Sequence, residues 1–266
     1  MTGRPAPATN GRTTPNRGKP MQPLAPETLE KLRGVSTATL TTQMFKRGFR
    51  NVFMQGVRPL APLSANLVGP AFTLRNIPAR EDLDHLGVFT DPGHPQRKAI
   101  ETTPEGHVLV IDCRRDDRVA SGGDILMTRL KVRGAAGMVS DGGVRDCGPI
   151  SEMGFPVFCA GPAAPLNLVL HHATDIDVPI GCGGVAVYPG DIVVGDRDGV
   201  VVIPRALAAE VAADAAEQEA LETFVLTRVA AGAALVGTYP PNEATRAAFE
   251  EWRRTERRAE HSGTGG

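Results

Sequence analysis

The chain has 266 residues, of which 41% are hydrophobic and 22% are charged, and its formal net charge is -1. This composition is typical of a soluble globular protein with a sizeable core, and it argues against a nucleic-acid binder that relies on a global positive field. No apolar run reaches the length of a membrane span, and the N-terminus lacks the apolar segment of a signal peptide. We therefore expect a cytoplasmic protein that binds neither nucleic acid nor membrane.

The two ends of the chain differ in composition from the rest. Residues 1–22 are rich in Pro, Gly, Thr and Asn, with four basic residues and no acidic one. Such a segment cannot form a core, so we expect a disordered tail there and a second one over residues 254–266. No linker interrupts residues 23–253, which we interpret as a single domain.

Hydrophobic periodicity predicts the following elements, in chain order: a helix at 26–35, a helix at 36–48, a strand at 66–77, a strand at 107–113, a helix at 125–134, a strand at 136–143, a strand at 155–161, three β-rich runs at 185–204, and a long helix at 205–232. The three runs are joined by Pro-Gly-Asp and Asp-Arg-Asp-Gly turns, which indicate an antiparallel meander. The alternation as a whole predicts an α/β fold with helices outside a mixed sheet core.

The four cysteines, Cys113, Cys147, Cys159 and Cys182, form no C-x-x-C pair. Their spacing fits neither a zinc site nor a disulfide framework, so we expect buried free thiols.

Two glycine-bracketed acidic turns stand out. Gly122-Gly123-Asp124 opens a predicted helix, and a second turn, from Asp141 to Asp146, follows the next strand. The strands before them should be neighbours in the sheet, and ligands of such units bind beyond the carboxyl ends of the strands. Both turns are therefore expected at one edge.

These turns carry complementary chemistry. The backbone amides of Ile125, Leu126 and Met127 at the helix start can attract an anion. Arg145 can fork onto a carboxylate, and Asp146 offers a hard oxygen ligand for Mg²⁺. With Asp124 facing the same space, the set suits a small dianionic or 2-keto acid substrate chelated to a divalent metal. In the alternative, purely structural interpretation, Asp124 is only a helix cap and Arg145–Asp146 only a loop ion pair.

The same stretch resembles the RraA-like family, which includes regulators of ribonuclease activity and 4-hydroxy-4-methyl-2-oxoglutarate/4-carboxy-4-hydroxy-2-oxoadipate aldolases. The aldolase members resemble class II pyruvate aldolases, with a signature acid, twenty intervening residues and then Arg-Asp. Here Asp124 is followed by twenty residues and Arg145-Asp146. The stretches VGPAFTL at 68–74 and YPGDIVVGDRDGVVVIP at 188–204 also fit. The resemblance implies a layered α/β/β/α sandwich of the swivelling-domain kind.

The resemblance also implies roles. Asp146 would ligate Mg²⁺ or Mn²⁺, Arg145 would bind the substrate carboxylate and help hold an enolate, and Asp124 would act through metal-bound water. The amides at 125–127 would hold the pyruvyl carboxylate. A neighbouring subunit would supply a glutamate, for which Glu222 fits best and Glu219 is the alternative, so a homotrimer or hexamer is expected.

The function implied is a metal-dependent lyase that cleaves a 4-hydroxy-2-oxo acid by a retro-aldol reaction and releases pyruvate. Oxaloacetate decarboxylation is the expected side activity. The alternative is a non-catalytic regulator that binds a ribonuclease or another protein. A substrate derived from a sugar acid is as compatible with the sequence as one from aromatic degradation.

Four further features stand outside these turns. His171-His172 could ligate a metal, but we interpret them as a helix end, and Asp196-Arg-Asp198-Gly199 as a hairpin turn rather than a calcium loop. The charged segment at 79–86 either borders the substrate entrance or is a solvated loop. Trp252 lies in a C-terminal extension that we expect to pack on a neighbouring subunit.

Overall fold

The computed structural model describes residues 23–263, so the tail expected at residues 1–22 lies outside the described residues, as do residues 264–266. The helices are α1 Pro26–Gly34, α2 Thr37–Lys46, α3 Pro95–Thr102, α4 Asp124–Val132, α5 Cys147–Glu152, α6 Ala208–Ala230 and α7 Glu243–Gly263. The strands are β1 Arg58–Pro59, β2 Leu67–Pro78, β3 Val108–Asp112, β4 Gly137–Ser140, β5 Gly143–Val144, β6 Val157–Cys159, β7 Gly161–Pro162, β8 His171–Ile176, β9 Ile180–Cys182, β10 Val185–Val187, β11 Ile192–Gly195 and β12 Val200–Ile203. Short 3-10 helices are η1 Leu86–Thr90, η2 Asn167–Val169 and η3 Arg205–Leu207.

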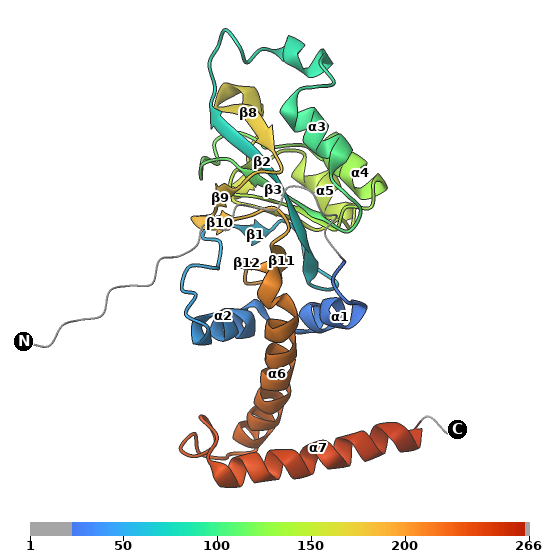
Figure 1. Cartoon of the computed structure of the whole chain (residues 1–266), viewed down its shortest axis with the longest axis vertical. Helices are drawn as coiled ribbons and strands as arrows, with labels where there is room; N and C mark the ends of the chain where they lie inside the picture. Colours follow the sequence, from blue (N-terminus) through green and yellow to red (C-terminus); the bar gives the residue numbers. More distant parts are fainter. Residues whose placement is uncertain (1–22, 264–266) are drawn as a thin grey trace, which may run out of the picture.

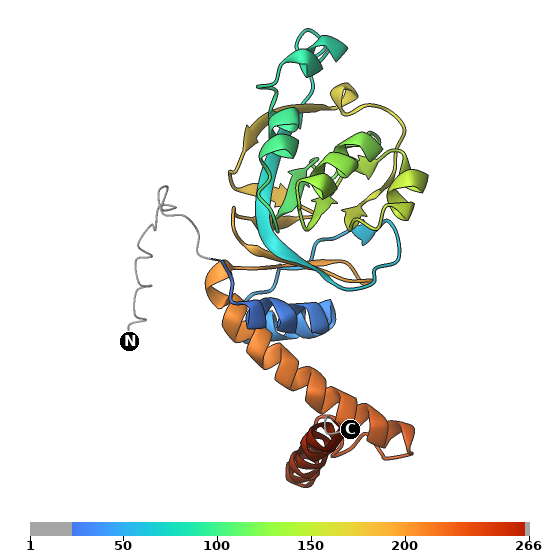
Figure 2. The same cartoon turned by 90° about the vertical axis from the view of Figure 1, so that its right-hand side faces the viewer.

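The main sheet is mixed and is organised around β2. Its order is β1-β6-β4-β3-β2-β11-β12, and β8 pairs with the far end of β2. Strands β2, β3, β4 and β6 run parallel, whereas β11 and β8 pair with β2 antiparallel along its first and second halves. Figure 2 shows β2 as one long curved strand, whose first half pairs with β11 and whose second half pairs with β8.

Buried side chains divide into layers because successive residues of a strand face opposite sides. On β3, Val108 and Val110 face an inner cluster, while Leu109 and Ile111 face a cluster shared with α3, α4 and α5. On β11 and β12 the outward side chains instead join a third cluster with α1, α2 and α6. The order of layers is therefore helix, sheet, sheet, helix, and the predicted layered α/β sandwich with a mixed sheet core is confirmed.

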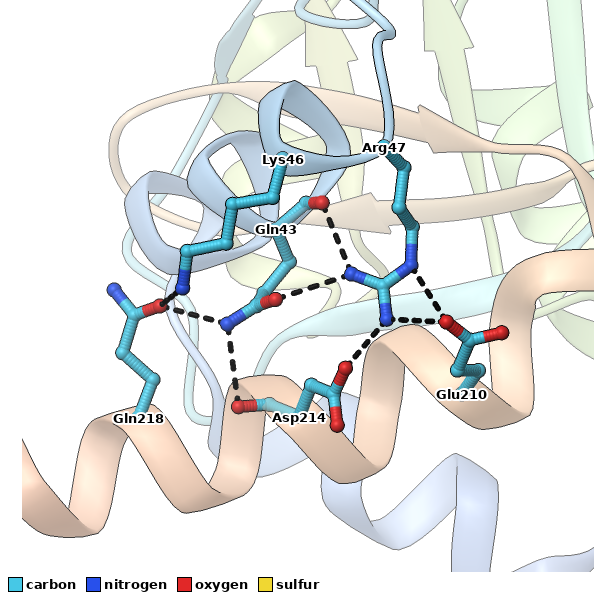
Figure 3. Close-up of polar contacts among 6 residues, drawn as sticks. All are labelled: Gln43, Lys46, Arg47, Glu210, Asp214 and Gln218. Atoms are coloured by element: carbon cyan, nitrogen blue, oxygen red, sulfur yellow. Dashed lines mark hydrogen bonds and ion pairs between the residues drawn. The ribbon is translucent and has the colours of Figure 1, made fainter.

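Helix α6 begins at the body of the molecule and extends away from it, and α7 lies across its far part (Figure 1). Polar contacts with α2 hold its first half (Figure 3). Arg47 reaches Glu210 at 2.7 Å and Asp214 at 2.5 Å, and Gln43 donates to Gln218 at 2.7 Å. The Arg47 side chain is only 15% exposed, so water screens these ion pairs less than it would on an open surface.

Most predicted elements are confirmed, but the meander at 185–204 is wrong. β11 and β12 do form a hairpin through the Asp196–Gly199 turn, as expected. β10, however, pairs with β9 in a separate sheet. The cause is the Gly183-Gly184 turn, in which both glycines have positive φ, as a tight two-residue hairpin requires.

One further prediction is wrong. His171-His172 begin strand β8 instead of ending a helix, because the second half of β2 pairs with them. Trp252 contacts Phe224 and Phe249 of its own chain, with ring centroids 5.6 and 6.0 Å apart, and its packing on a neighbouring subunit stays a prediction. Helix α7 also continues to Gly263, past residue 254 where the C-terminal tail was expected to begin.

All four cysteines are free, and Cys113, Cys159 and Cys182 are buried while Cys147 is partly exposed. Over residues 23–263, none of the helices combines the length and apolarity that crossing a bilayer requires.

We predict that Gly195→Ala destabilises the fold by about 1–3 kcal/mol, since overpacking a dense core forces neighbours to shift. A Cβ at Gly195 would lie 2.6 Å from Cζ of the fully buried Phe158 ring. The matched control is Gly181→Ala in β9, where a Cβ meets nothing within 4 Å. Urea unfolding of both variants measures the difference, and equal losses would contradict the close approach.

Candidate functional site

Backbone pairing joins the two predicted turns beyond the carboxyl ends of β3 and β4. The Ser121 amide donates to Gly143 O at 2.8 Å, and the Arg145 amide donates to Gly122 O at 3.1 Å. The Ser121 hydroxyl also donates to Gly143 O at 2.9 Å. As a result Asp124, Arg145 and Asp146 lie together, as the sequence predicts.

The glycines of the second turn are needed for close packing. A Cβ at Gly142 would lie 2.6 Å from Cβ of Cys113, and one at Gly143 would lie 2.4 Å from Cβ of Ala163. Any larger residue would push the Arg145 loop away from the Gly122 loop.

Asp146 occupies a strained position. Its φ and ψ are 59° and 40°, a left-handed conformation that costs a non-glycine residue of order 1 kcal/mol or more. Its Oδ2 lies 3.3 Å from Nε of Arg145 and 3.4 Å from the Asp124 amide. Gly123 permits this approach, because a Cβ there would lie 2.4 Å from the same Oδ2. Such strain marks a candidate functional position.

The amides at the start of α4 are less free than the sequence suggests. Those of Leu126 and Met127 donate to Gly123 O at 3.1 Å, and that of Ile125 donates to Oδ1 of Asp124 at 2.7 Å. Backbone hydrogen bonds at the start of α4 therefore already engage two of the three predicted anion-binding amides, and the Asp124 side chain engages the third. Met127 is also fully buried, so its side chain is part of the core.

A small cavity of about 110 Å³ lies beside these loops. Its lining includes Asp124, Arg145, Ile125 and Leu126 among the predicted residues, but neither Met127 nor Asp146. The full lining is Phe89, Gln96, Arg97, Ala120, Gly122, Gly123, Asp124, Ile125, Leu126, Arg145, Leu166 and Asn167.

Six of these residues were not predicted from the sequence: Phe89, Gln96, Arg97, Ala120, Leu166 and Asn167. Phe89 comes from η1, and Gln96 and Arg97 come from α3. Burial, and then repulsion from Arg145, lower the pKa of Arg97 below its ordinary value. The sequence did contain one signal for helix α3. Pro95 stands in its first turn, a position where proline commonly begins a helix. The neighbouring 79–86 segment forms a turn in which Asp84 Oδ1 lies 2.8 Å from Nδ1 of His172.

The two candidate glutamates of α6 have different surroundings. Glu219 Oε1 accepts hydrogen bonds from the Ser36 amide at 2.9 Å and the Ser36 hydroxyl at 2.7 Å, which ties α6 to the start of α2. Glu222 accepts one bond, from Gln218 one turn earlier, and borders a groove with α7. Neither lines the cavity of its own chain, and α6 extends away from α3 and α4 (Figure 1).

A model of the RraA-like family, described as Aldolase/RraA, matches residues 37–202, well over half of the chain. The chain belongs to the RraA-like family. A relative in Halalkalibacterium halodurans named "Putative 4-hydroxy-4-methyl-2-oxoglutarate aldolase" is 38% identical over 148 residues, which is 55% of this chain and 64% of the relative. Protein DlpA of Legionella pneumophila is 26% identical over 212 residues, 79% of this chain and 33% of that protein. The chain thus spans less than two thirds of these two relatives.

Solved structures show the same fold. An uncharacterised protein of Pseudomonas syringae has a TM-score of 0.70 at 25% identity and covers 82% of this chain and 100% of its own. Streptomyces coelicolor RraAS2, described as an unusual member of the RNase ES inhibitor RraA family, has a TM-score of 0.67 at 32% identity over 77% of this chain and 98% of its own. The family thus contains proteins named as aldolases and as ribonuclease inhibitors.

We predict that Glu219→Gln lowers the free energy of unfolding by about 0.5–1 kcal/mol at pH 7, since a partly exposed charged acceptor is lost. Partial burial raises the pKa of Glu219, but the Ser36 hydrogen bonds outweigh it and the net pKa is lowered. A lowered pKa gives stability that is present above the unfolded value of about 4.3 and is lost as pH falls below it. The difference from wild type should therefore vanish in acid.

Urea unfolding at neutral and acidic pH measures this effect. Glu222→Gln is the control, and it should match wild type at both pH values. If Glu222→Gln proves as destabilising as Glu219→Gln, Glu222 is also a structural residue and loses its place as the candidate catalytic acid.

Proposed function

We propose that the protein is a divalent-metal-dependent lyase that cleaves a carbon–carbon bond of a 4-hydroxy-2-oxo acid and releases pyruvate. The observation that carries this proposal is the meeting of Arg145 and Asp124 at one cavity, with the strained Asp146 carboxylate beside them. The names of relatives as putative aldolases support the same reaction class.

The donor chemistry fits Mg²⁺ or Mn²⁺. Asp146 and Asp124 offer carboxylate oxygens, and Mg²⁺ is commonly held by one or two carboxylates together with water and substrate oxygens. Among residues 23–263 there is no group of three or more His, Cys, Asp or Glu that could hold a metal. A bound cation would supply positive charge that stabilises a developing enolate oxygen.

Arg145 binds the substrate in this proposal. Its guanidinium can hold the carboxylate of a 2-oxo acid by two parallel hydrogen bonds, which fixes the orientation of the neighbouring keto group. The positive charge also lies beside the oxygen on which negative charge develops. Its present neighbour, Oδ2 of Asp146 at 3.3 Å, keeps the side chain at the cavity.

Asp124 directs the proton transfer. Retro-aldol cleavage removes the proton of the 4-hydroxyl, breaks the C3–C4 bond, and leaves its electron pair in the enolate of pyruvate while C4 becomes a carbonyl. Asp124 is the carboxylate in the cavity lining, and it can guide this proton through a water molecule. Protonation of C3 then completes pyruvate. The same enolate would form from oxaloacetate by loss of carbon dioxide, which is the proposed side activity.

A second subunit completes the site in this proposal. Glu222 cannot serve its own cavity, because α6 leads away from it (Figure 1). Glu219 is already engaged by Ser36, which leaves Glu222 as the more available acid of the helix. We propose a homotrimer or hexamer in which α6 of one subunit reaches the cavity of the next.

We predict metal-dependent pyruvate release from a panel of 4-hydroxy-2-oxo acids with Mg²⁺ or Mn²⁺, and its loss in EDTA. Asp146→Ala should reduce kcat/KM by about 100-fold or more, since a catalytic metal contributes several kcal/mol. Asp117→Asn, at an exposed position outside the cavity lining, is the control. A coupled assay for pyruvate measures all variants.

Two outcomes would count against the lyase. Full activity of Asp146→Ala would remove the proposed ligand. The absence of metal-dependent pyruvate from every acid tested would favour a non-catalytic regulator, as the description of RraAS2 suggests for that protein.

We also predict that light scattering finds a trimer or a hexamer and that Glu222→Gln lowers kcat without changing the oligomeric state. Mixing Glu222→Gln with Asp146→Ala subunits should restore part of the activity, because some sites would then combine an intact Asp146 with an intact Glu222 from a neighbour. An active monomer would contradict the role of Glu222.

A further inference from the structure

The cavity has a side that the cleavage described above does not use. Helix α3 contributes two consecutive residues to it, Gln96 and Arg97, and η1 contributes Phe89. This side faces the same space as Arg145 and Asp124 but comes from the segment between β2 and β3. Its chemistry therefore bears on which substrate is accepted.

Arg97 is a partly buried cation, and the ion pairs found in residues 23–263 include none that involves it. Its guanidinium lies 4.2 Å from the centroid of the Phe89 ring, which holds it in place without neutralising it. Arg145 lines the same cavity, so two guanidinium groups face one carboxylate, that of Asp124. A ligand with two negative groups would balance this charge.

Gln96 is 4% exposed, and its two amide atoms differ in how they are satisfied. Nε2 donates to Ser121 O at 2.9 Å, whereas the buried Oε1 has no hydrogen-bond partner. Turning the amide over would set Oε1 against a carbonyl oxygen, so the Ser121 bond fixes the orientation. A buried acceptor without a partner is costly, and it becomes satisfied when a donor enters the cavity.

We propose that Gln96 and Arg97 recognise the part of the substrate remote from its 2-oxo acid end. Oε1 of Gln96 accepts a hydrogen bond from the substrate hydroxyl, and Arg97 pairs with a second carboxylate. This inference rests on the proposed function and assigns to Gln96 and Arg97 the selection of a hydroxylated 2-oxo dicarboxylic acid, the class of compound in the names of the putative aldolase relatives. Arg145 then holds one end of the substrate and Arg97 the other.

Arg97 can be tested with two inert five-carbon ligands that differ in one carboxylate. Calorimetry with the Mg²⁺-loaded protein should show that 2-oxoglutarate binds about tenfold more tightly than 2-oxopentanoate, since a hydrogen-bonded charge pair contributes this much. Arg97→Gln should remove the preference and leave 2-oxopentanoate binding within about twofold of wild type. Arg97→Lys should retain part of it, and Lys98→Gln, at the exposed next position of α3, should retain all of it.

Gln96 can be tested with the same dicarboxylate as the control. Gln96→Met should raise KM and lower kcat for a cleavable 4-hydroxy-2-oxo dicarboxylate, yet leave the binding of 2-oxoglutarate, which lacks the hydroxyl, within about twofold of wild type. If Gln96→Met weakens both the cleavage of the 4-hydroxy-2-oxo dicarboxylate and the binding of 2-oxoglutarate to the same degree, Gln96 only supports the Ser121 loop. Thermal melts of each variant separate this result from unfolding.

The outcomes distinguish the inference from the function on which it rests. If both ligands bind and Arg97→Gln keeps the wild-type preference, or if wild type has no preference, the recognition by Arg97 is wrong and the lyase stands. If wild type binds neither ligand, the proposed function fails and this inference fails with it.

Discussion

The pairing of two loops across the ends of neighbouring parallel strands is the constraint on which the candidate site depends. Two backbone hydrogen bonds, Ser121 to Gly143 and Arg145 to Gly122, set the distance between the start of α4 and the Arg145 loop. Glycine is required on both sides, because a Cβ at Gly123 or Gly143 would lie 2.4 Å from its neighbour. The charged groups can therefore approach one another only because the backbones do so first.

The layered core makes this pairing rigid. β3 and β4 are buried on both faces, between the inner cluster and the cluster under α3 to α5. Their carboxyl ends are consequently fixed relative to each other. Asp146 itself is exposed, and its Oδ2 lies near Nε of Arg145 and the Asp124 amide. α6 has the opposite character. Its first half is held by polar contacts with the α2 segment (Figure 3), whereas its second half extends beyond the sandwich (Figure 1).

Hydrophobic periodicity predicted the central strands β2, β3, β4 and β6 and the helices α1, α2, α4 and α6, but it did not predict α3, α5 or α7. The proximity of Asp124 to Arg145 and Asp146 followed from the two turns that come after neighbouring strands. It failed where tertiary pairing decides the structure: β10 pairs with β9 through the Gly183-Gly184 turn, and His171-His172 join the free half of β2. The contribution of Arg97 was not predictable from the spacing of residues along the chain. Helix α3 is short, and only the order of the strands in the sheet places it beside the cavity. Sequence also could not reveal that the amides of Leu126 and Met127 are already bonded.

The positive charges of the cavity link its two sides, the turn that carries Arg145 and the helix α3 that carries Arg97. Arg145 belongs to the turn after β4, whereas Arg97 belongs to α3, yet burial and then repulsion from Arg145 lower the pKa of Arg97. Two cations are held near each other only at a cost, which an anionic ligand offsets. In the proposed function, Arg145 and Arg97 hold opposite ends of one dianionic substrate. The helix that carries Arg97 can then change substrate choice without altering the residues proposed to break the bond.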